Sequence, residues 1–127
     1  MALSTKSNHT LLITEDVNSN FDLLKASVGR NFTRVLHACN GIEAVELCKY
    51  DNDIAMVLMD ISMPDMNGYD ATRLIKQIKP DLPVIALTAY INDDTIRQIK
   101  DSGCDDFMLK PFQIKDLQTL IRSYTGF

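Results

Sequence analysis

Four short runs of apolar residues, each leading to polar residues of a different kind, constrain the fold of this chain more than any other feature. The runs cover residues 11–13, 54–59, 84–87 and 107–109. A charged group directly after such a run is costly unless it leaves the core at the end of a strand. The runs are therefore predicted to be buried strands whose ends reach the surface.

The polar residues after these runs form a chemically complementary set. Asp60 follows the longest run, Glu15 and Asp16 follow the first, and Thr88 and Lys110 follow the other two. If the runs are parallel strands of one sheet, these side chains share one edge of it. Carboxylates suit a divalent cation, and an ammonium group suits phosphate. We therefore predict a site for a divalent cation and a phosphoryl group.

Strand and helix patterns alternate along the chain, with no internal repeat. Strands are predicted near residues 11–14, 33–38, 54–59, 83–87 and 106–109, and helices near 18–29, 41–49, 68–79, 92–102 and 113–124. Five such units indicate an open parallel sheet with helices on both faces and right-handed connections. Ligands of such sheets bind at the carboxyl ends of the strands, where the polar set lies.

Composition narrows the possible functions. The 127 residues suit a single domain, and a net charge of −4 argues against a nucleic-acid surface. Three widely spaced cysteines without a CxxC pair argue against zinc, and free thiols suggest a reducing cytoplasm. The longest apolar run has six residues, too short to span a bilayer. Residues 1–9 are interpreted as a polar tail or linker, and residues 10–127 as the domain.

Four segments together resemble the signature blocks of response-regulator receiver domains. They are ITED (13–16), VLMDISMPDMNG (57–68), ALTAY (86–90) and DDFMLKPF (105–112). The likeness covers about residues 10–125 and is greatest to receivers of hybrid sensor histidine kinases in two-component phosphorelays. It implies a single-domain, doubly wound flavodoxin-like α/β fold, with a five-stranded parallel sheet in the order 2-1-3-4-5.

The resemblance also implies a metal site around a phosphoacceptor. Asp60 matches the phosphoacceptor. Glu15 and Asp16 match the acidic pair that holds Mg²⁺ together with Asp60 and the backbone carbonyl of Ser62, and Mn²⁺ can substitute. Ser62 and Tyr90 stand at two variable positions that modulate dephosphorylation in the family. The dephosphorylation rate of this chain is therefore left open.

Other matched positions concern charge and switching. Lys110 matches the lysine that pairs with the phosphoryl group, and Thr88 matches the hydroxyl that bonds it. Phe107 matches the aromatic switch residue, and the bond between Lys110 and Pro111 matches one that is usually cis. Phosphorylation is expected to draw Thr88 inward and to let Phe107 rotate into the space behind it.

The resemblance implies a phosphorylation-controlled switch rather than an enzyme of independent turnover, although the domain promotes its own phosphorylation and dephosphorylation. The expected donor is a histidine kinase or a histidine phosphotransfer domain, facing the helix at 18–29. The output partner is left open, and we expect a monomer or weak dimer without nucleic-acid or membrane contact. A cytoplasmic location is expected, either alone or as a fragment of a longer regulator or membrane-bound hybrid kinase.

Two other functions compete with this one. A receiver-like protein-interaction module that is never phosphorylated would be favoured by missing site residues, and none is missing. A phosphatase of the haloacid-dehalogenase kind would begin with Asp-x-Asp, whereas Ser62 stands two residues after Asp60. His9 and His37 invite a phosphohistidine interpretation, but they lie in a polar tail and in a strand pattern and are interpreted as incidental.

Overall fold

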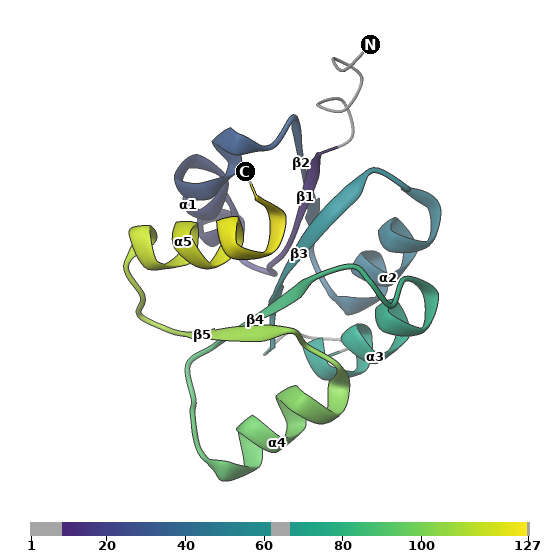
Figure 1. Ribbon diagram of the computed structural model, residues 1–127, viewed down its shortest axis with the longest axis vertical. Coiled ribbons are helices and arrows are strands. Elements are labelled where there is room, and N and C mark those ends of the chain that lie inside the picture. Colours follow the sequence, from purple (N-terminus) through teal and green to yellow (C-terminus); the bar gives the residue numbers. More distant parts are fainter. Residues whose placement is uncertain (1–8, 62–66, 127) are drawn as a thin grey trace.

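Strands and helices alternate throughout residues 9–61 and 67–126, the part of the chain that this computed structural model describes (Figure 1). The strands are β1 (Thr10–Thr14), β2 (Arg34–Ala38), β3 (Ile54–Asp60), β4 (Val84–Thr88) and β5 (Asp106–Leu109). The helices are α1 (Asn18–Val28), α2 (Gly41–Tyr50), α3 (Gly68–Ile78), α4 (Asp93–Ser102) and α5 (Ile114–Thr125), and a 3₁₀ turn, η2 (Gly29–Asn31), follows α1.

The five strands form one parallel sheet in the order β2-β1-β3-β4-β5, which confirms the predicted order. Neighbouring strands end almost level with one another. Thr14 lies opposite Met59 of β3, and Thr88 of β4 lies opposite Leu109 of β5. The carboxyl ends of β1, β3, β4 and β5 therefore meet along one edge.

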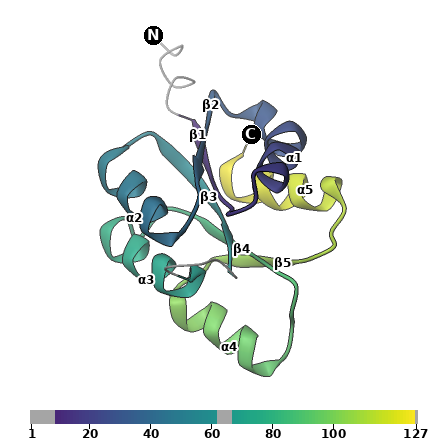
Figure 2. The ribbon, with the colours of Figure 1, turned by 180° about the vertical axis from the view of Figure 1, so that it is seen from behind.

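Helices cover both faces of the sheet, as Figures 1 and 2 show from opposite sides, with α1 and α5 on one face and α2, α3 and α4 on the other. Side chains of a strand alternate between the two faces. Leu11 and Ile13 accordingly pack in the α1/α5 layer, and Leu12 packs in the other layer. The central strand β3 contributes to both layers, which explains its uninterrupted apolar sequence.

Three helices begin at an asparagine that caps them. The side chains of Asn40, Asn67 and Asn92 each accept a hydrogen bond from the backbone N–H three residues later. Gly103 ends α4 with a φ of 94°, a left-handed conformation that favours glycine. Helix α1 has no side-chain cap, and its N-cap residue, Val17, directly follows the acidic pair.

The structure adjusts several predicted boundaries by one or two residues. Strands β3 and β4 include Asp60 and Thr88 as their last residues, so both side chains start from a fixed backbone. The Lys110–Pro111 bond is cis, as predicted. Ser62 lies outside the described residues. None of the helices described here has both the length and the apolar character needed to cross a membrane.

Candidate functional site

Three carboxylates lie together at the carboxyl edge of the sheet. Glu15 and Asp16 follow β1 and Asp60 ends β3, and one oxygen from each lies within 4.8 Å of the other two. Glu15 is 2% exposed and Asp60 is 7% exposed, whereas Asp16 reaches solvent. This donor set fits Mg²⁺, which prefers oxygen ligands and retains several waters.

Lys110 supplies the positive charge beside these acids. Its Nζ lies 3.5 Å from Oδ2 of Asp60 and 4.0 Å from Oε1 of Glu15. Its backbone N–H donates to the carbonyl of Thr88 at 2.7 Å, so β4 fixes the position of the lysine. One ammonium group against three carboxylates leaves an excess of negative charge, which a divalent cation neutralises when it binds.

Crowding at this edge changes the acidity of Glu15. Burial raises the pKa of its carboxyl group, and the neighbouring charge of Asp60 raises it further. The backbone N–H of Val17, 3.2 Å from Oε2, and the ammonium group of Lys110 act in the opposite direction. A proton is therefore held on Glu15 more readily than on an exposed glutamate, and it competes with a metal ion for the same oxygens.

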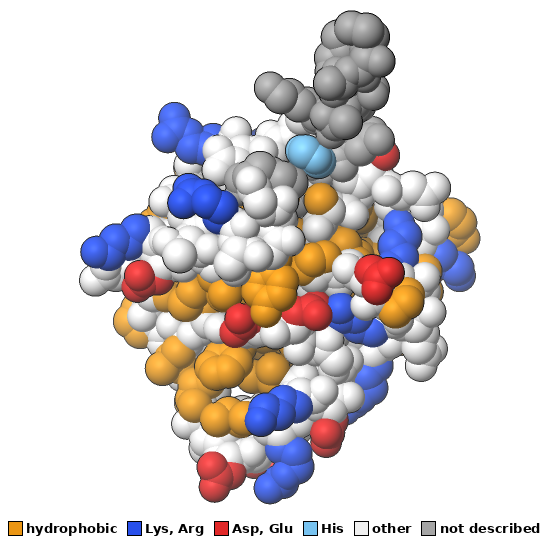
Figure 3. Space-filling model, in the orientation of Figure 1, with side chains coloured by type: hydrophobic (Ala, Val, Ile, Leu, Met, Phe, Trp, Pro, Cys, Tyr) orange, Lys and Arg blue, Asp and Glu red, His pale blue; other side chains and the backbone are white. Residues whose placement is uncertain are grey.

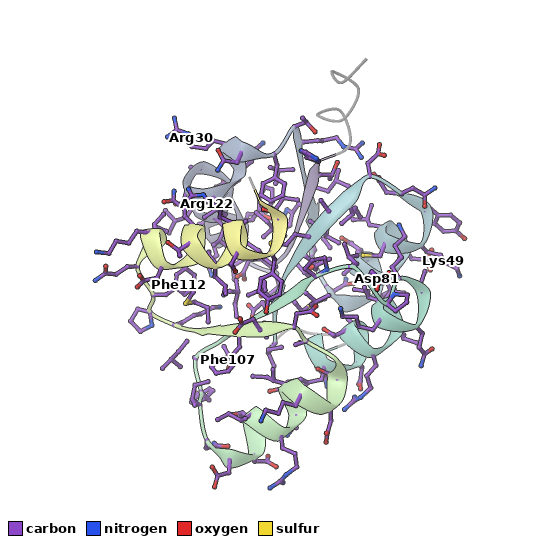
Figure 4. The ribbon with its side chains drawn as sticks, in the orientation of Figure 1. Arg30, Lys49, Asp81, Phe107, Phe112 and Arg122 are labelled. Carbon is purple, nitrogen blue, oxygen red and sulfur yellow. The ribbon has the colours of Figure 1, made fainter. Side chains whose placement is uncertain are left out.

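The Thr88 hydroxyl is engaged with the loop after β4. It donates to the carbonyl of Tyr90 at 3.1 Å and accepts from the N–H of Tyr90 at 3.2 Å. Phe107, on β5 in Figure 4, is half-buried and packs against the layer formed with α2, α3 and α4. The switch roles of Thr88 and Phe107 therefore stay predictions, each starting from a defined resting position.

A groove of about 340 Å³ adjoins the acidic cluster, between α1 and the connection from β5 to α5. Figure 4 shows Phe112, one of its lining residues, on that connection. Most of the lining is apolar, and Glu15 and Lys110 reach the groove from the site. The lining residues are Glu15, Asn20, Leu23, Leu24, Leu87, Lys110, Pro111, Phe112 and Ile114.

Gly68 contributes to the site, although the sequence pattern indicates only that a helix starts there. A Cβ at this position would lie 2.7 Å from the carbonyl oxygen of Asp60 and 2.9 Å from Cα of Ile61. The Gly68 N–H donates to the carbonyl of Ile61 at 3.1 Å. Only glycine lets α3 begin this close to the end of β3. The Asn-Gly pair before an apolar helix pattern is the signal that could have suggested it.

His37 is a second contributor, and its interpretation as incidental misses two contacts. Its Nε2 lies 2.8 Å from the backbone carbonyl oxygen of Glu15. Its ring stacks on Phe21 of α1, with centroids 3.9 Å apart and planes 6° apart. Strand periodicity places His37 in β2 but says nothing about its partners, so the sequence holds no signal for these contacts.

The structure thus brings four of the predicted site residues into one cluster and places two more nearby. Thr88 lies at the same sheet edge, and Tyr90 is 69% exposed beyond it. Ser62, predicted as a carbonyl ligand and modulator, belongs to the segment that is not described. The clustered residues are Glu15, Asp16, Asp60 and Lys110.

Comparison with known proteins settles the family. Residues 11–122 match the family model of the response regulator receiver domain. The chain belongs to this family. A hybrid signal transduction histidine kinase of Dictyostelium discoideum is 35% identical over 120 residues, which are 90% of this chain and 3% of that protein. The receiver domain therefore spans a small part of this relative, and 15% of a matching transcription factor of Chaetomium thermophilum.

Solved receiver domains have the same fold. A response regulator receiver domain protein of Methanospirillum hungatei superposes with a TM-score of 0.86 at 22% identity, covering 93% of this chain and 94% of that one. The receiver domain of a sensor histidine kinase of Pseudomonas aeruginosa superposes with a TM-score of 0.83 at 29% identity, covering 93% and 98%. That structure has a magnesium ion coordinated in its active site cleft.

Proposed function

We propose that Asp60 accepts a phosphoryl group from a phosphohistidine, with Mg²⁺ bound beside it, and that the aspartyl phosphate changes a surface of the domain. One observation carries this proposal. Three carboxylates lie within 4.8 Å of one another, and the ammonium group of Lys110 lies 3.5 Å from Asp60. The proposed nucleophile, the proposed metal ligands and the ammonium group proposed to pair with the transferred group therefore lie close together.

The transfer step exchanges one phosphorus bond for another. An oxygen of the Asp60 carboxylate attacks the phosphorus atom of the phosphohistidine, and the P–N bond breaks as the P–O bond forms. The electron pair of the broken bond returns to the imidazole nitrogen, which takes a proton from solvent. Water later hydrolyses the acyl phosphate, which restores the carboxylate and releases inorganic phosphate.

The metal would be held by the side chains of Glu15, Asp16 and Asp60, and by the backbone carbonyl of Ser62 as the family resemblance implies. A bound Mg²⁺ neutralises charge on the transferred oxygens. Mn²⁺ also takes carboxylate, carbonyl and water ligands, so it is proposed as a substitute. The exposed Asp16 leaves one side of the cluster open to solvent, from which a hydrated ion can enter.

Lys110 and Thr88 are proposed to bind the transferred group itself. The Lys110 ammonium group already contacts the Asp60 carboxylate and would pair with a phosphoryl oxygen after transfer. Thr88 would have to leave its two hydrogen bonds with Tyr90 to donate to another phosphoryl oxygen. Movement of this hydroxyl would therefore couple phosphorylation to the loop between β4 and α4.

The surface expected to respond lies over α4, β5 and α5. Figure 3 shows hydrophobic side chains gathered between α5 and α4 on this face. Exposed apolar residues here are Tyr90, Ile91, Leu109 and Tyr124. A shift of Thr88 and rotation of Phe107 would rearrange this surface, as a population shift between two packings. An output partner is proposed to read that change.

The groove beside α1 is proposed to receive the phosphodonor. It leads along Leu23 and Phe112 to Glu15 and Lys110, so a donor lying in it could present its histidine to Asp60. A histidine kinase or a histidine phosphotransfer domain is the proposed donor. A cytoplasmic location is proposed with it, for a stand-alone regulator or for the receiver portion of a longer kinase.

Intact-mass spectrometry tests the phosphoacceptor directly. The chain is incubated with acetyl phosphate, and separately with a phosphorylated histidine phosphotransfer domain, with and without Mg²⁺. We expect one Mg²⁺-dependent phosphoryl adduct that hydroxylamine removes, and no adduct on Asp60→Asn. Asp70→Asn is the matched control, because Asp70 is an exposed carboxylate on α3 that pairs with Arg73 and does not belong to the acidic cluster.

Two outcomes contradict the proposal. An adduct of equal yield on Asp60→Asn would place the phosphoryl group on another residue. A folded natural chain that gains no adduct from either donor would instead favour an interaction module that is not phosphorylated.

A further inference from the structure

His37 lies on β2, the edge strand beside β1, and its half-buried ring reaches the first residue after β1. Its Nε2 is 2.8 Å from the backbone carbonyl oxygen of Glu15. A carbonyl oxygen only accepts, so Nε2 carries the proton and donates it. The neutral Nε2–H tautomer and the imidazolium ion both supply this donor.

This hydrogen bond continues the contact between the two strands past the end of the sheet. The backbone N–H of Glu15 donates to the carbonyl of Ala38 at 2.9 Å. Strand β2 ends at Ala38, and the chain then turns into α2. The Glu15 carbonyl therefore takes its hydrogen bond from the His37 side chain, and β2 holds the Glu15 backbone through both polar groups.

We call residues 15–21 the acidic turn. The imidazole of His37 also contacts Phe21, the last residue of this segment. The Phe21 ring stacks on His37 with centroids 3.9 Å apart. The Phe21 N–H donates to the carbonyl of Val17 at 3.1 Å, which forms the first turn of α1. The acidic turn, which carries Asp16, is thus fixed near both of its ends by one side chain from another strand.

We propose that His37 is a positioning residue for the metal site. It touches neither the cation nor the phosphoryl group. It fixes the backbone of the acidic turn so that the carboxylates of Glu15 and Asp16 face Asp60. Metal ligands are oriented by such outer contacts, and loss of one lowers metal affinity. The inference rests on the proposed function in one respect, that this cluster binds Mg²⁺.

Two substitutions separate the hydrogen bond from the ring stacking. His37→Phe keeps a ring to stack on Phe21 and removes the donor. His37→Gln removes the ring and keeps an N–H donor at similar reach. Magnesium affinity is measured by titrating MgCl₂ into labelled protein and following backbone amide signals of Asp16 and Ile61. We expect His37→Phe to weaken Mg²⁺ binding about fivefold, the effect of one net hydrogen bond, and His37→Gln to stay close to the natural chain.

A kinetic readout separates positioning from a general loss of structure. The rate of phosphorylation by acetyl phosphate is measured against Mg²⁺ concentration. In His37→Phe the concentration for half-maximal rate should rise about fivefold, while the rate at saturating Mg²⁺ stays unchanged. Val35→Ala is the control, because Val35 lies on the same strand and packs against the α1/α5 core. It should lower stability and leave the Mg²⁺ dependence as it is.

The outcomes distinguish this inference from the proposed function. If the natural chain binds Mg²⁺ and His37→Phe binds it equally well, the positioning role is wrong and the proposed function stands. If His37→Gln loses as much affinity as His37→Phe, the donor role is wrong. If the natural chain binds no Mg²⁺, the metal site in the proposed function fails.

Discussion

Charged side chains have different partners at the two ends of the strands, which we call the amino edge, where the strands begin, and the carboxyl edge, where they end. At the amino edge, Lys76 donates to Asp105 and to the carbonyl of Leu82, both at 2.7 Å, and Asp105 also accepts from the N–H of Val84. At the carboxyl edge, three carboxylates lie together, and one lysine is 3.5 Å from Asp60 and 4.0 Å from Glu15. Charges at the amino edge bind other parts of the protein, whereas those at the carboxyl edge are placed to bind an ion.

The carboxyl edge also contains a buried threonine hydroxyl, at the end of β1. Thr14 Oγ1, at the carboxyl end of β1, is buried and has no hydrogen-bond partner in the part of the chain that the structure describes. An unsatisfied buried polar group destabilises the folded state. This hydroxyl and the neighbouring carboxylates are therefore features of the carboxyl edge that lower stability, as groups at functional sites commonly do.

The largest expected effect tests how tightly the backbone is packed at the carboxyl edge. Gly68→Ala places a Cβ against the backbone of Asp60 and Ile61, which cannot move without shifting β3. We expect a loss of about 3 kcal/mol in the free energy of unfolding, measured in urea. Gly126→Ala is a control with open space around it, although its φ of 79° adds some strain. If Gly68→Ala loses less free energy of unfolding than Gly126→Ala, the backbone around the site moves easily to make room for the methyl group.

A change at the amino edge should cost somewhat less. Lys76→Met keeps the length of the side chain but leaves Asp105 and the Leu82 carbonyl without their shared donor. Because the Lys76 side chain is only 15% exposed, we expect a loss of about 2 kcal/mol, with Mg²⁺ affinity unchanged. Arg73→Met, which breaks an exposed ion pair, should cost about 0.5 kcal/mol or less. Equal losses in Lys76→Met and Arg73→Met would mean that the contacts of Lys76 contribute no more to stability than an exposed ion pair does.

A smaller effect than that of Lys76→Met, with the opposite sign, is expected at the carboxyl edge. Glu15→Gln removes one buried charge from the carboxyl edge, so it should stabilise the metal-free protein by about 1 kcal/mol, measured by thermal unfolding in a chelator. The same variant should lose most of the stabilisation that Mg²⁺ gives the natural chain. Destabilisation without metal would show that Lys110 already compensates the Glu15 charge fully.

The difference in stability between Glu15→Gln and the natural chain without metal should depend on pH, because the pKa of Glu15 is raised. The folded protein holds the Glu15 proton to a higher pH than the unfolded chain, whose value is near 4.5. As pH rises from that value through the higher folded pKa, the folded state binds more protons, so this residue lowers stability progressively. The advantage of Glu15→Gln should therefore grow across this window and then level off. A constant advantage would mean that the folded and unfolded chains hold the Glu15 proton equally, so that folding does not raise its pKa.

The sequence alone predicts much of the carboxyl edge but not the charge network of the amino edge. Uninterrupted apolar runs identify buried strands, and parallel strands must end on one side, so the sequence alone places Asp60 and Lys110 together. The same periodicity predicts the helices to within a residue or two, because capping residues such as Asn92 mark their starts.

The amino-edge network and the support of the acidic turn could not be predicted, because both depend on contacts between distant segments. Lys76 meets Asp105 across 29 residues, and His37 meets the Glu15 carbonyl across 22. Neither pairing leaves a local pattern. The resting hydrogen bonds of Thr88 were equally hidden, because a strand-end threonine can direct its hydroxyl to a loop or to a ligand.

The two hydrogen bonds between Thr88 and Tyr90 bear on the timing of a signal. Both are hydrogen bonds between neutral groups, each with a net contribution of about 1 kcal/mol, so the barrier to their breaking should be low. Under the proposed function, the surface would then re-equilibrate far faster than an acyl phosphate hydrolyses. The duration of the signal would be set by the chemical lifetime of the modification, with no memory held in the conformation itself.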